Sequence, residues 1–370
     1  MKKACFVLIV ILLCNITKGK EYAVSIDFAN FRLNELQYLG THNSYKKFLQ
    51  ADLLRALAIW DQPLADSIDY EHLPLNEQLH DYGVRQIELD LFADPEGGHY
   101  AKRMGLAFLG KNPHSQDLEM YKPGFKVMHI QDIDFETSCL TFKECLRQVK
   151  GWSSHHANHL PLAILIELKD QKIEDPLKLG FAKPFPTTKD IVDDLDREIL
   201  EIFDQDHVMT PDDVRKDYKT LPEAIMKNGW PFIKELQGKV YFIFNCSAKQ
   251  CALYLQDYPA LQKRMMFIDS DPGKPESAFV TINQPQGKNL TKIKSLVKKG
   301  YMVRTRADHD TIQARSGDIS QRDAAWASGA HFISTDYIEP FNKFCTNYQV
   351  ILPGGDVVRC NEVVNLELCR

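Results

Sequence analysis

The sequence predicts an α/β protein built as a TIM (β/α)8 barrel, and two features of the chain support this fold class. Short continuous apolar runs, typical of strands buried on both faces, alternate with helical stretches through most of the 370 residues. No glycine-rich GxGxxG loop follows the first of these runs, so the usual sign of a dinucleotide-binding sheet is missing. The alternation taken alone also fits an open doubly wound sheet.

The expected elements can be placed along the chain from these patterns. Nine strand-like runs lie at 36–40, 84–92, 125–130, 162–168, 240–244, 265–268, 279–282, 301–304 and 331–334. Helical stretches between them lie at 74–82, 142–150, 190–203 and 290–299. Because a closed barrel of this kind needs eight strands, we expect either 265–268 or 279–282 to lie outside the barrel.

The N-terminus has the organisation of a secretory signal peptide. A short basic segment, Met1-Lys2-Lys3, precedes an apolar run from Ala4 to Cys14. This run is shorter than the roughly 20 residues that span a bilayer. We therefore assign 1–20 to a signal peptide, 21–340 to the barrel and 341–370 to a cysteine-containing C-terminal extension. A secreted or periplasmic protein with no transmembrane segment in its mature chain is expected, and an uncleaved membrane anchor is the alternative.

Composition and cysteine spacing agree with an exported globular protein. Hydrophobic residues make up 44% of the chain, and the net charge of -5 argues against a general nucleic-acid binder. Of the nine cysteines, Cys5 and Cys14 lie in the signal peptide, which leaves seven. Three pairs close in sequence predict disulfides in an oxidising compartment, namely Cys139/Cys145, Cys246/Cys251 and Cys345/Cys360. Cys369 is then left over or competes with a neighbour.

Polar side chains gather at the predicted carboxyl ends of the first four strands, where TIM barrels carry their active sites. The residues concerned are His42 and Asn43 after the first strand, Glu88 and Asp90 in the second, His129 at the end of the third and Glu167 at the end of the fourth. A single histidine at a strand end is commonly a hydrogen-bonded core residue. The convergence of all six is what predicts a site.

The acidic residues of this group predict a metal centre. Glu88 and Asp90 are two residues apart, so on a strand both side chains point to the same face. The flanking apolar residues fit the outer face covered by helices, which turns the carboxylates into the barrel. Carboxylates gathered there repel one another and lose hydration unless a cation compensates. With Glu167 and Asn43 they form an all-oxygen site that suits Ca2+ more than zinc.

These segments resemble a known enzyme family. Gly40-Thr41-His42-Asn43-Ser44-Tyr45, Glu88-Leu89-Asp90, Val127-Met128-His129 and Ile164-Leu165-Ile166-Glu167 resemble, in order and approximate spacing, the X-region of phosphoinositide-specific phospholipases C. The likeness is to the secreted, calcium-dependent, single-domain branch, which has a PLC-like phosphodiesterase TIM barrel. The segments 303–308 and 330–337 are similar to the last two barrel strands of that branch.

The resemblance implies a role for each matching residue. His42 would be the general base for the inositol 2-hydroxyl, and His129 would protonate the diacylglycerol leaving group. Asn43, Glu88, Asp90 and Glu167 would hold Ca2+, which lowers the pKa of the attacking hydroxyl and neutralises phosphate charge. The products would be diacylglycerol and a cyclic inositol phosphate that water opens more slowly.

Basic residues near the same strand ends are candidates for substrate binding. Lys169, Arg304 and Arg306 either contact the phosphate or form ion pairs with the carboxylates. Asp308 is either a charge on the rim or a partner of another site residue. The strand at 239–245 lacks the lysine pair with which eukaryotic members read ring phosphates, so the resemblance does not extend to polyphosphorylated inositides.

A phospholipid substrate at a membrane surface requires contact with that surface. Two apolar segments, 48–60 and 104–109, either meet the interface or pack on the barrel as insertions. Two other functions stay open. One is a phosphodiesterase for glycerophosphodiesters or sphingolipids, although that class typically places an arginine where Asn43 follows His42. The other is a non-catalytic lipid-binding barrel.

Overall fold

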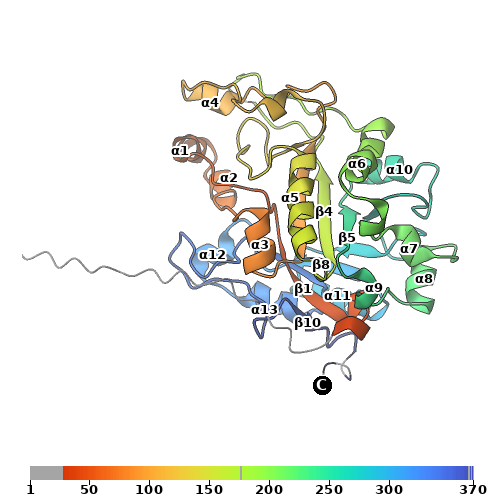
Figure 1. Ribbon diagram of the computed structural model, residues 1–370. Coiled ribbons are helices and arrows are strands. Elements are labelled where there is room, and N and C mark those ends of the chain that lie inside the picture. The colour runs from red at the N-terminus through yellow and green to blue at the C-terminus, as the bar shows by residue number, and fades with distance from the viewer. Residues whose placement is uncertain (1–27, 176, 366, 368, 370) are drawn as a thin grey trace, which may run out of the picture.

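Eight parallel strands surround the core of the computed structural model, which describes residues 28–175, 177–365, 367 and 369 (Figure 1). The predicted signal peptide lies outside these residues. In chain order the barrel strands are β1 (Leu36–Thr41), β2 (Gln86–Phe92), β4 (Leu162–Leu168), β5 (Val240–Phe244), β6 (Met266–Ile268), β7 (Phe279–Thr281), β8 (Met302–Arg306) and β9 (Phe332–Thr335). Their order around the barrel is β6-β5-β4-β2-β1-β9-β8-β7.

The barrel is almost closed, and its seam lies between β6 and β7. A single parallel bridge joins Asp269 to Phe279 there, and Ser270 N donates to Phe279 O at 3.2 Å. Both β6 and β7 therefore belong to the barrel. The expectation that one of these two segments lies outside was wrong, and the predicted TIM barrel is confirmed.

Of the nine predicted strand-like runs, the one that lies outside the parallel barrel contains β3 (Lys126–Val127), which pairs antiparallel with β2 through Leu91 and Phe92. A parallel strand requires a crossover that returns the chain to the opposite end of the sheet. Between β2 and β3 the chain forms only the short helix α4 (Met104–Phe108) and a 3-10 turn, so it re-enters the sheet from the end it left. His129 consequently sits on a turn after β3 and not at the carboxyl end of a barrel strand.

Helices cover the outside of the barrel (Figure 1). Besides α4 they are α1 (Ala51–Trp60), α2 (Gln62–Ser67), α3 (Leu75–Asp81), α5 (Phe142–His155), α6 (Lys189–Ile202), α7 (Pro211–Arg215), α8 (Leu221–Lys227), α9 (Ile233–Leu236), α10 (Ala248–Leu255), α11 (Lys288–Lys298), α12 (Ile312–Ser316) and α13 (Ser320–Ala327). In α5, Thr141 caps the first turn by accepting from Glu144 N, and buried residues recur at helical spacing along one face. Among the described residues, no helix has the length and apolar character needed to cross a bilayer.

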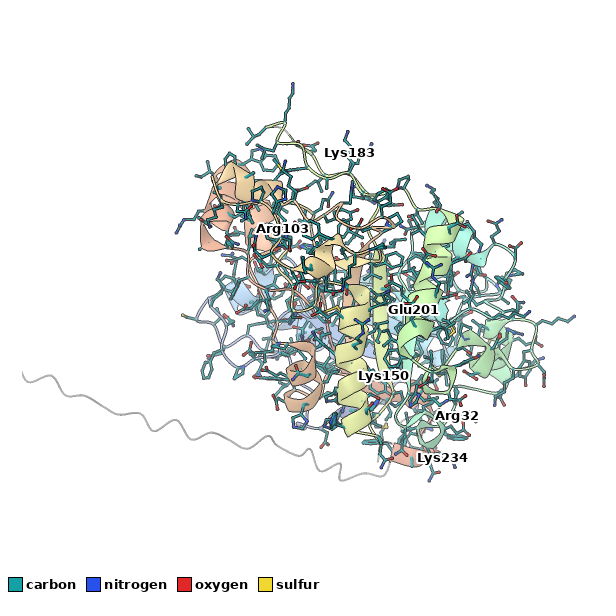
Figure 2. All side chains as sticks on the ribbon, turned by 45° about the horizontal axis from the view of Figure 1, so that its top comes forward. Arg32, Arg103, Lys150, Lys183, Glu201 and Lys234 are labelled. Carbon is teal, nitrogen blue, oxygen red and sulfur yellow. A yellow bond between two sulfur atoms is a disulfide. The ribbon has the colours of Figure 1, made fainter. Side chains whose placement is uncertain are left out.

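The two ends of the barrel differ in what they carry. Figure 2 shows Arg103 and Lys183, which lie in the loops after β2 and β4, at the end of the molecule where α1 and α4 lie. Arg32 and Lys234 precede β1 and β5 and lie toward the opposite end. The long loops thus extend from the carboxyl ends of the strands, where the candidate site residues also lie.

The C-terminal segment returns to the barrel through β10 (Val358–Cys360), which pairs antiparallel with β1. Disulfides join Cys139 to Cys145 and Cys246 to Cys251, as predicted. The predicted pair of Cys345 with Cys360 is wrong, because Cys360 bonds to Cys369 and Cys345 is free and exposed. Cys360 is held in β10 and the chain after it turns back within nine residues, which favours the later cysteine.

Candidate active site

The nine residues predicted for the site belong to one network at the carboxyl end of the barrel. Hydrogen bonds, ion pairs or electrostatic effects on pKa link His42, Asn43, Glu88, Asp90, His129, Glu167, Lys169, Arg304 and Arg306. The network has two histidine-centred parts and an acidic cluster that interacts electrostatically with both.

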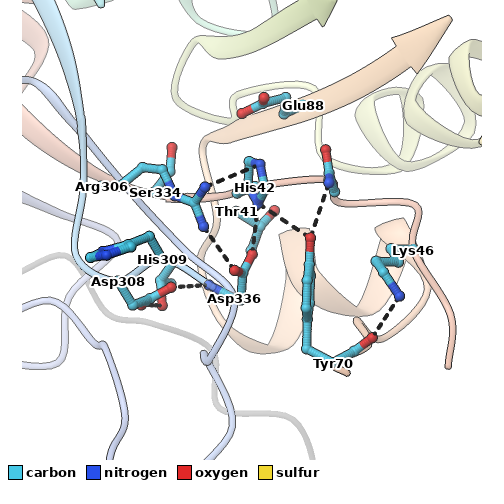
Figure 3. Close-up of polar contacts among 12 residues, drawn as sticks. Thr41, His42, Lys46, Tyr70, Glu88, Arg306, Asp308, His309, Ser334 and Asp336 are labelled. Carbon is cyan, nitrogen blue, oxygen red and sulfur yellow. Dashed lines mark hydrogen bonds and ion pairs between the residues drawn. The ribbon is translucent and has the colours of Figure 1, made fainter. Parts of the chain in front are cut away.

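His42 is held by three neighbours from distant parts of the chain (Figure 3). Its Nδ1 atom lies 3.0 Å from Oδ1 of Asp336 and 3.3 Å from the hydroxyl of Tyr70. Its Nε2 atom lies 3.3 Å from NH1 of Arg306, and NH2 of the same arginine pairs with Asp336 at 2.9 Å. With Nδ1–H donating to Asp336, the lone pair of the neutral ring is at Nε2.

The surroundings favour the neutral form of His42. Burial and the charge of Arg306 lower the pKa of His42 to about 4, although Asp336 and Glu88 act in the opposite direction. Burial would raise the pKa of Asp336, but its interactions with His42 and Arg306, hydrogen bonds included, hold that pKa well below its usual range. His42 is therefore an imidazole able to accept a proton at neutral pH.

Asp308 fixes the residue that orients His42. Its Oδ1 atom accepts from the backbone N–H of Asp336 at 2.9 Å, and its Oδ2 atom accepts from Thr335 Oγ1 and from the hydroxyl of Tyr348. All these groups are buried. Of the two roles left open for Asp308, the structure supports the partner role.

The sharp turn after β1 explains the sequence around His42. Asn43 has φ of 46°, in the left-handed region that asparagine tolerates better than most residues. Ser44 N donates to Glu88 O at 3.0 Å, and Glu88 N donates to Ser44 Oγ at 2.8 Å, so the turn is bonded to β2. The side-chain amide of Asn43 donates to the Tyr70 hydroxyl.

His129 has a second buried aspartate as its partner. Its Nδ1 atom lies 2.8 Å from Oδ2 of Asp134, and the other oxygen of Asp134 is 3.2 Å from Nζ of Lys46. Lys46 is fully buried and also donates to the backbone carbonyl of Tyr70. Although burial raises the pKa of Asp134, Lys46 and His129 outweigh it and leave that pKa below its usual value. Asp134 is thus a carboxylate in position to stabilise a protonated His129.

The three carboxylates that the sequence predicts as metal ligands form one cluster in the structure. Oxygen atoms of Glu88, Asp90 and Glu167 lie within 4.8 Å of one another. Arg304 pairs with Glu88 at 2.5 Å, and Lys169 pairs with Asp90 at 3.1 Å and with Glu167 at 2.7 Å. Lys169, Arg304 and Arg306 are therefore all ion-paired with acidic residues of the site.

The acidic cluster is short of positive charge, and a divalent cation fits it. Neither carboxylate oxygen of the buried Asp90 has a hydrogen-bond partner among the described residues, and its ion pair with Lys169 is the compensation present. Burial, with a further contribution from Glu167, raises the pKa of Asp90 to about 7 despite Lys169. Hard oxygen donors around an undercompensated buried charge match the coordination that Ca2+ prefers.

The electrostatic effects connect both histidines to β2. Glu88 raises the pKa of His42, and His129 lowers the pKa of Asp90. Glu88 and Asp90, which point to the same face of β2, thus interact with His42 and His129 respectively. The arrangement offers carboxylates that would hold a metal ion, a neutral imidazole, and a second imidazole paired to a carboxylate.

Sequence reasoning missed the residues that position the histidines. These are Asp336, Asp134, Tyr70 and Lys46. Asp336 lies directly after β9, at a strand end where a polar residue is a sign of function. Asp134 lies five residues after His129, and no spacing rule singles it out.

Comparisons with known proteins agree with this geometry. Residues 31–362 match the family described as phosphoinositide phospholipase C, Ca2+-dependent. The calcium-dependent phosphoinositol-specific phospholipase C of a Gram-negative Pseudomonas species has a similar structure, with 16% identity, a TM-score of 0.57, and coverage of 90% of this chain and 96% of that one. A Ca2+-dependent phosphatidylinositol-specific phospholipase C from Streptomyces antibioticus is 17% identical with a TM-score of 0.50, covering 82% of this chain and 94% of that one.

At these identities the two structures support the fold alone, and no curated protein sequence matches the chain. The family match spans most of the sequence, however, and includes both histidines and the acidic cluster. This protein therefore belongs to the Ca2+-dependent phosphoinositide phospholipase C family of enzymes, with calcium as its cofactor.

Proposed function

We propose that this enzyme cleaves phosphatidylinositol-type lipids by attack of the inositol 2-hydroxyl on phosphorus, giving diacylglycerol and a cyclic inositol phosphate. The observation that carries the proposal is the pair of imidazoles, each bonded through Nδ1 to a buried aspartate and each coupled to one carboxylate of β2. Two imidazoles in different electrostatic surroundings suit a reaction that removes one proton and supplies another.

His42 is the general base in this mechanism. Its neutral ring accepts the proton of the 2-hydroxyl at Nε2, while Nδ1–H remains bonded to Asp336. Asp336 stabilises the imidazolium that forms. Arg306, which lies against Nε2, is in position to shift its bond to a phosphate oxygen when substrate enters.

His129 is the general acid. In the protonated state its Nε2–H donates to the glycerol oxygen as the bond between that oxygen and phosphorus breaks, and Asp134 holds the ring through Nδ1. After this step His42 is protonated and His129 is neutral. A water molecule that opens the cyclic product reverses both transfers and restores the starting state.

Glu88, Asp90 and Glu167, whose oxygens lie close together, would hold the calcium ion, with Asn43 of the turn bonded to β2 as a fourth ligand. When bound, Ca2+ lowers the pKa of the attacking hydroxyl and offsets negative charge on the phosphate. Lys169, Arg304 and Arg306 keep the carboxylates in place and add positive charge at the mouth. Phosphatidylinositol without ring phosphates is the substrate that this set of residues suits, because β5 ends at Phe244, is followed by Asn245 and contains no lysine.

The basic and apolar pattern of residues 1–20 and the disulfides support a location outside the cytoplasm. We therefore propose a secreted or periplasmic enzyme that meets phospholipid at a membrane surface.

The test is a head-group comparison with and without calcium. Phosphatidylinositol, phosphatidylcholine, sphingomyelin and glycerophosphodiesters are incubated with the mature protein in free Ca2+ or in excess EGTA. Release of water-soluble phosphate from phosphatidylinositol alone, and only with calcium, is expected. Faster release from a choline or glycerol diester would favour the related phosphodiesterases, and full activity in EGTA would refute the calcium site.

A further inference from the structure

A cavity of about 320 Å3 lies beside the candidate active site and has an almost entirely apolar lining. Its walls come from α1, α4, Ile133 and four residues that follow β4, namely Asp175, Leu177, Leu179 and Phe181. The volume is at the lower end of the range of small-molecule sites. Figure 1 shows α1 and α4 side by side at the end of the barrel that carries the long loops.

The lining presents apolar side chains to solvent where a packed core would hide them. Ile59 is 90% exposed, Leu177 is 60% exposed, and Trp60 and Phe108 are each 49% exposed. The one charged residue of the lining, Asp175, already accepts from the backbone N–H groups of the loop at 179–181. A ligand of this cavity is therefore recognised by apolar contact and not by hydrogen bonds or charge.

The cavity is attached to the turn that presents His129. Asp132, three residues further on, accepts from Met104 N at 2.8 Å and from Ala182 N at 2.6 Å, so it holds α4 and the loop together. Ile133 lines the cavity, and the next residue, Asp134, bonds His129. The wall of the cavity and the proposed general acid are thus parts of one turn.

A glycine allows this close packing. At Gly105 in α4, an added Cβ would lie 2.4 Å from the carbonyl oxygen of Asp132 and 3.2 Å from a methyl group of Leu53 in α1. Only the absence of a side chain lets α4 approach both the turn and α1. The position of α4, which forms one wall of the cavity, therefore depends on Gly105.

We propose that this cavity binds an acyl chain of the lipid substrate. The inference rests on the proposed function, because His129 would protonate the glycerol oxygen and the chains attached to that glycerol must leave the mouth on the side of His129. On that side the cavity is the apolar surface that continues from the turn, through Ile133. Removing a chain from water into it favours productive binding by about fourfold per methylene.

Binding can be measured without turnover through Trp60. The chain has four tryptophans, and the other three, Trp152, Trp230 and Trp326, are buried. Sub-micellar 12-bromododecanoic acid should quench the fluorescence of the mature protein saturably, and Trp60→Phe should abolish this response.

Ala56→Phe, which fills the cavity, and Leu177→Asp, which places a charge in its wall, should each weaken binding at least tenfold. Leu118→Asp is the matched control, since Leu118 is 75% exposed and outside the lining.

Turnover of monodisperse substrates gives the second measurement. For wild type, kcat/KM should rise with acyl length from dibutanoyl to dioctanoyl phosphatidylinositol below the micellar concentration. Ala56→Phe and Leu177→Asp should flatten this dependence and leave hydrolysis of cyclic inositol phosphate unchanged. No saturable quenching by wild type, or an affinity in both variants equal to that of wild type, would overturn the proposal. An effect of the variants on vesicles alone would also overturn it, because the cavity would then attach the protein to a bilayer. If no inositol lipid is cleaved, the proposed function fails while the quenching still decides whether the cavity binds an acyl chain.

Discussion

The two histidine-centred parts of the site use the same design with different cations. In each, a buried aspartate accepts from Nδ1 of the imidazole. At His42 the cation is Arg306, which contacts both the aspartate and Nε2 of the ring. At His129 the cation is Lys46, which pairs with the aspartate, and neither Lys46 nor any other described residue makes a hydrogen bond to Nε2 of the ring.

This difference suggests how one site supports opposite proton transfers. Burial and a guanidinium against the ring keep His42 neutral, as a base requires. The carboxylate of Asp134 faces His129 without a cation at the ring, so a protonated imidazole is compensated there. Arg306 lies against the ring of His42, as the role of base requires, whereas Lys46 contacts the aspartate of His129, as the role of acid requires.

The largest expected effect comes from removing either imidazole. His42→Ala and His129→Ala should each lower kcat on phosphatidylinositol by about 10²- to 10⁴-fold, because general acid or base catalysis is lost. A substrate with a p-nitrophenol leaving group should rescue most of the activity of His129→Ala and little of that of His42→Ala, since that leaving group needs no proton. Steady-state kinetics on both substrates measures this, with the exposed His114→Ala as the matched control. Equal rescue of both variants would show that the two histidines are not divided as proposed.

Next in size is the loss of the metal centre. Asp90→Asn removes a buried carboxyl group whose ionised form is disfavoured by burial. The calcium-free variant should therefore be at least as stable as wild type. Calcium affinity should fall on the order of 100-fold, because a ligand is lost. Thermal unfolding with and without Ca2+ and calorimetric titration measure both quantities. A calcium-induced rise in Tm equal to that of wild type would argue against Asp90 as a ligand.

The aspartate partners should show a smaller effect that leaves the metal centre intact. Asp336→Asn and Asp134→Asn should each reduce kcat by about 10- to 100-fold, because the imidazole loses its orienting carboxylate. Calcium affinity should stay within about twofold of wild type, in contrast to Asp90→Asn. Calcium titrations of the two variants provide the check. A large loss of calcium affinity in either variant would show that the histidine–aspartate pairs and the metal centre are not separate parts of the site.

The smallest expected effect concerns His331, a buried histidine that has no part in the proposed chemistry. Nδ1 of His331 accepts from Val303 N, its Nε2–H donates to Asn34 O, and burial lowers the pKa of His331 to about 4. The folded pKa lies below the unfolded value of about 6.5, so this contribution to stability is complete above that pH and is lost as the pH falls toward 4.

At pH 5 the loss amounts to about 2 kcal/mol. Urea unfolding at pH 5 and pH 7 should show His331→Gln destabilised at both values, with a smaller difference between them than wild type has. If the free energy of unfolding depends on pH equally in His331→Gln and in wild type, that dependence comes from other titratable groups.

The repeating features of the fold were predictable from sequence, and the reasons are physical. Strands such as β4 and β5 are continuous apolar runs, and the two-residue spacing of Glu88 and Asp90 determines that they share a face. The direction of β3 was not predictable from its apolar run, since it depends on the lack of a crossover between β2 and β3. Asp336 and Asp134 were not predicted as partners of His42 and His129. Which aspartate reaches a histidine depends on how the chain folds, and no fixed spacing in the sequence indicates it.

The central claim, attack by the inositol 2-hydroxyl between two imidazoles, is tested most directly by 31P NMR of the reaction in the presence of calcium. The account predicts that the resonance of an inositol 1,2-cyclic phosphate appears first and that the acyclic phosphate follows more slowly from it. Direct formation of the acyclic phosphate, with no cyclic species at any time, would mean that water attacks phosphorus and would contradict the roles given to His42 and His129.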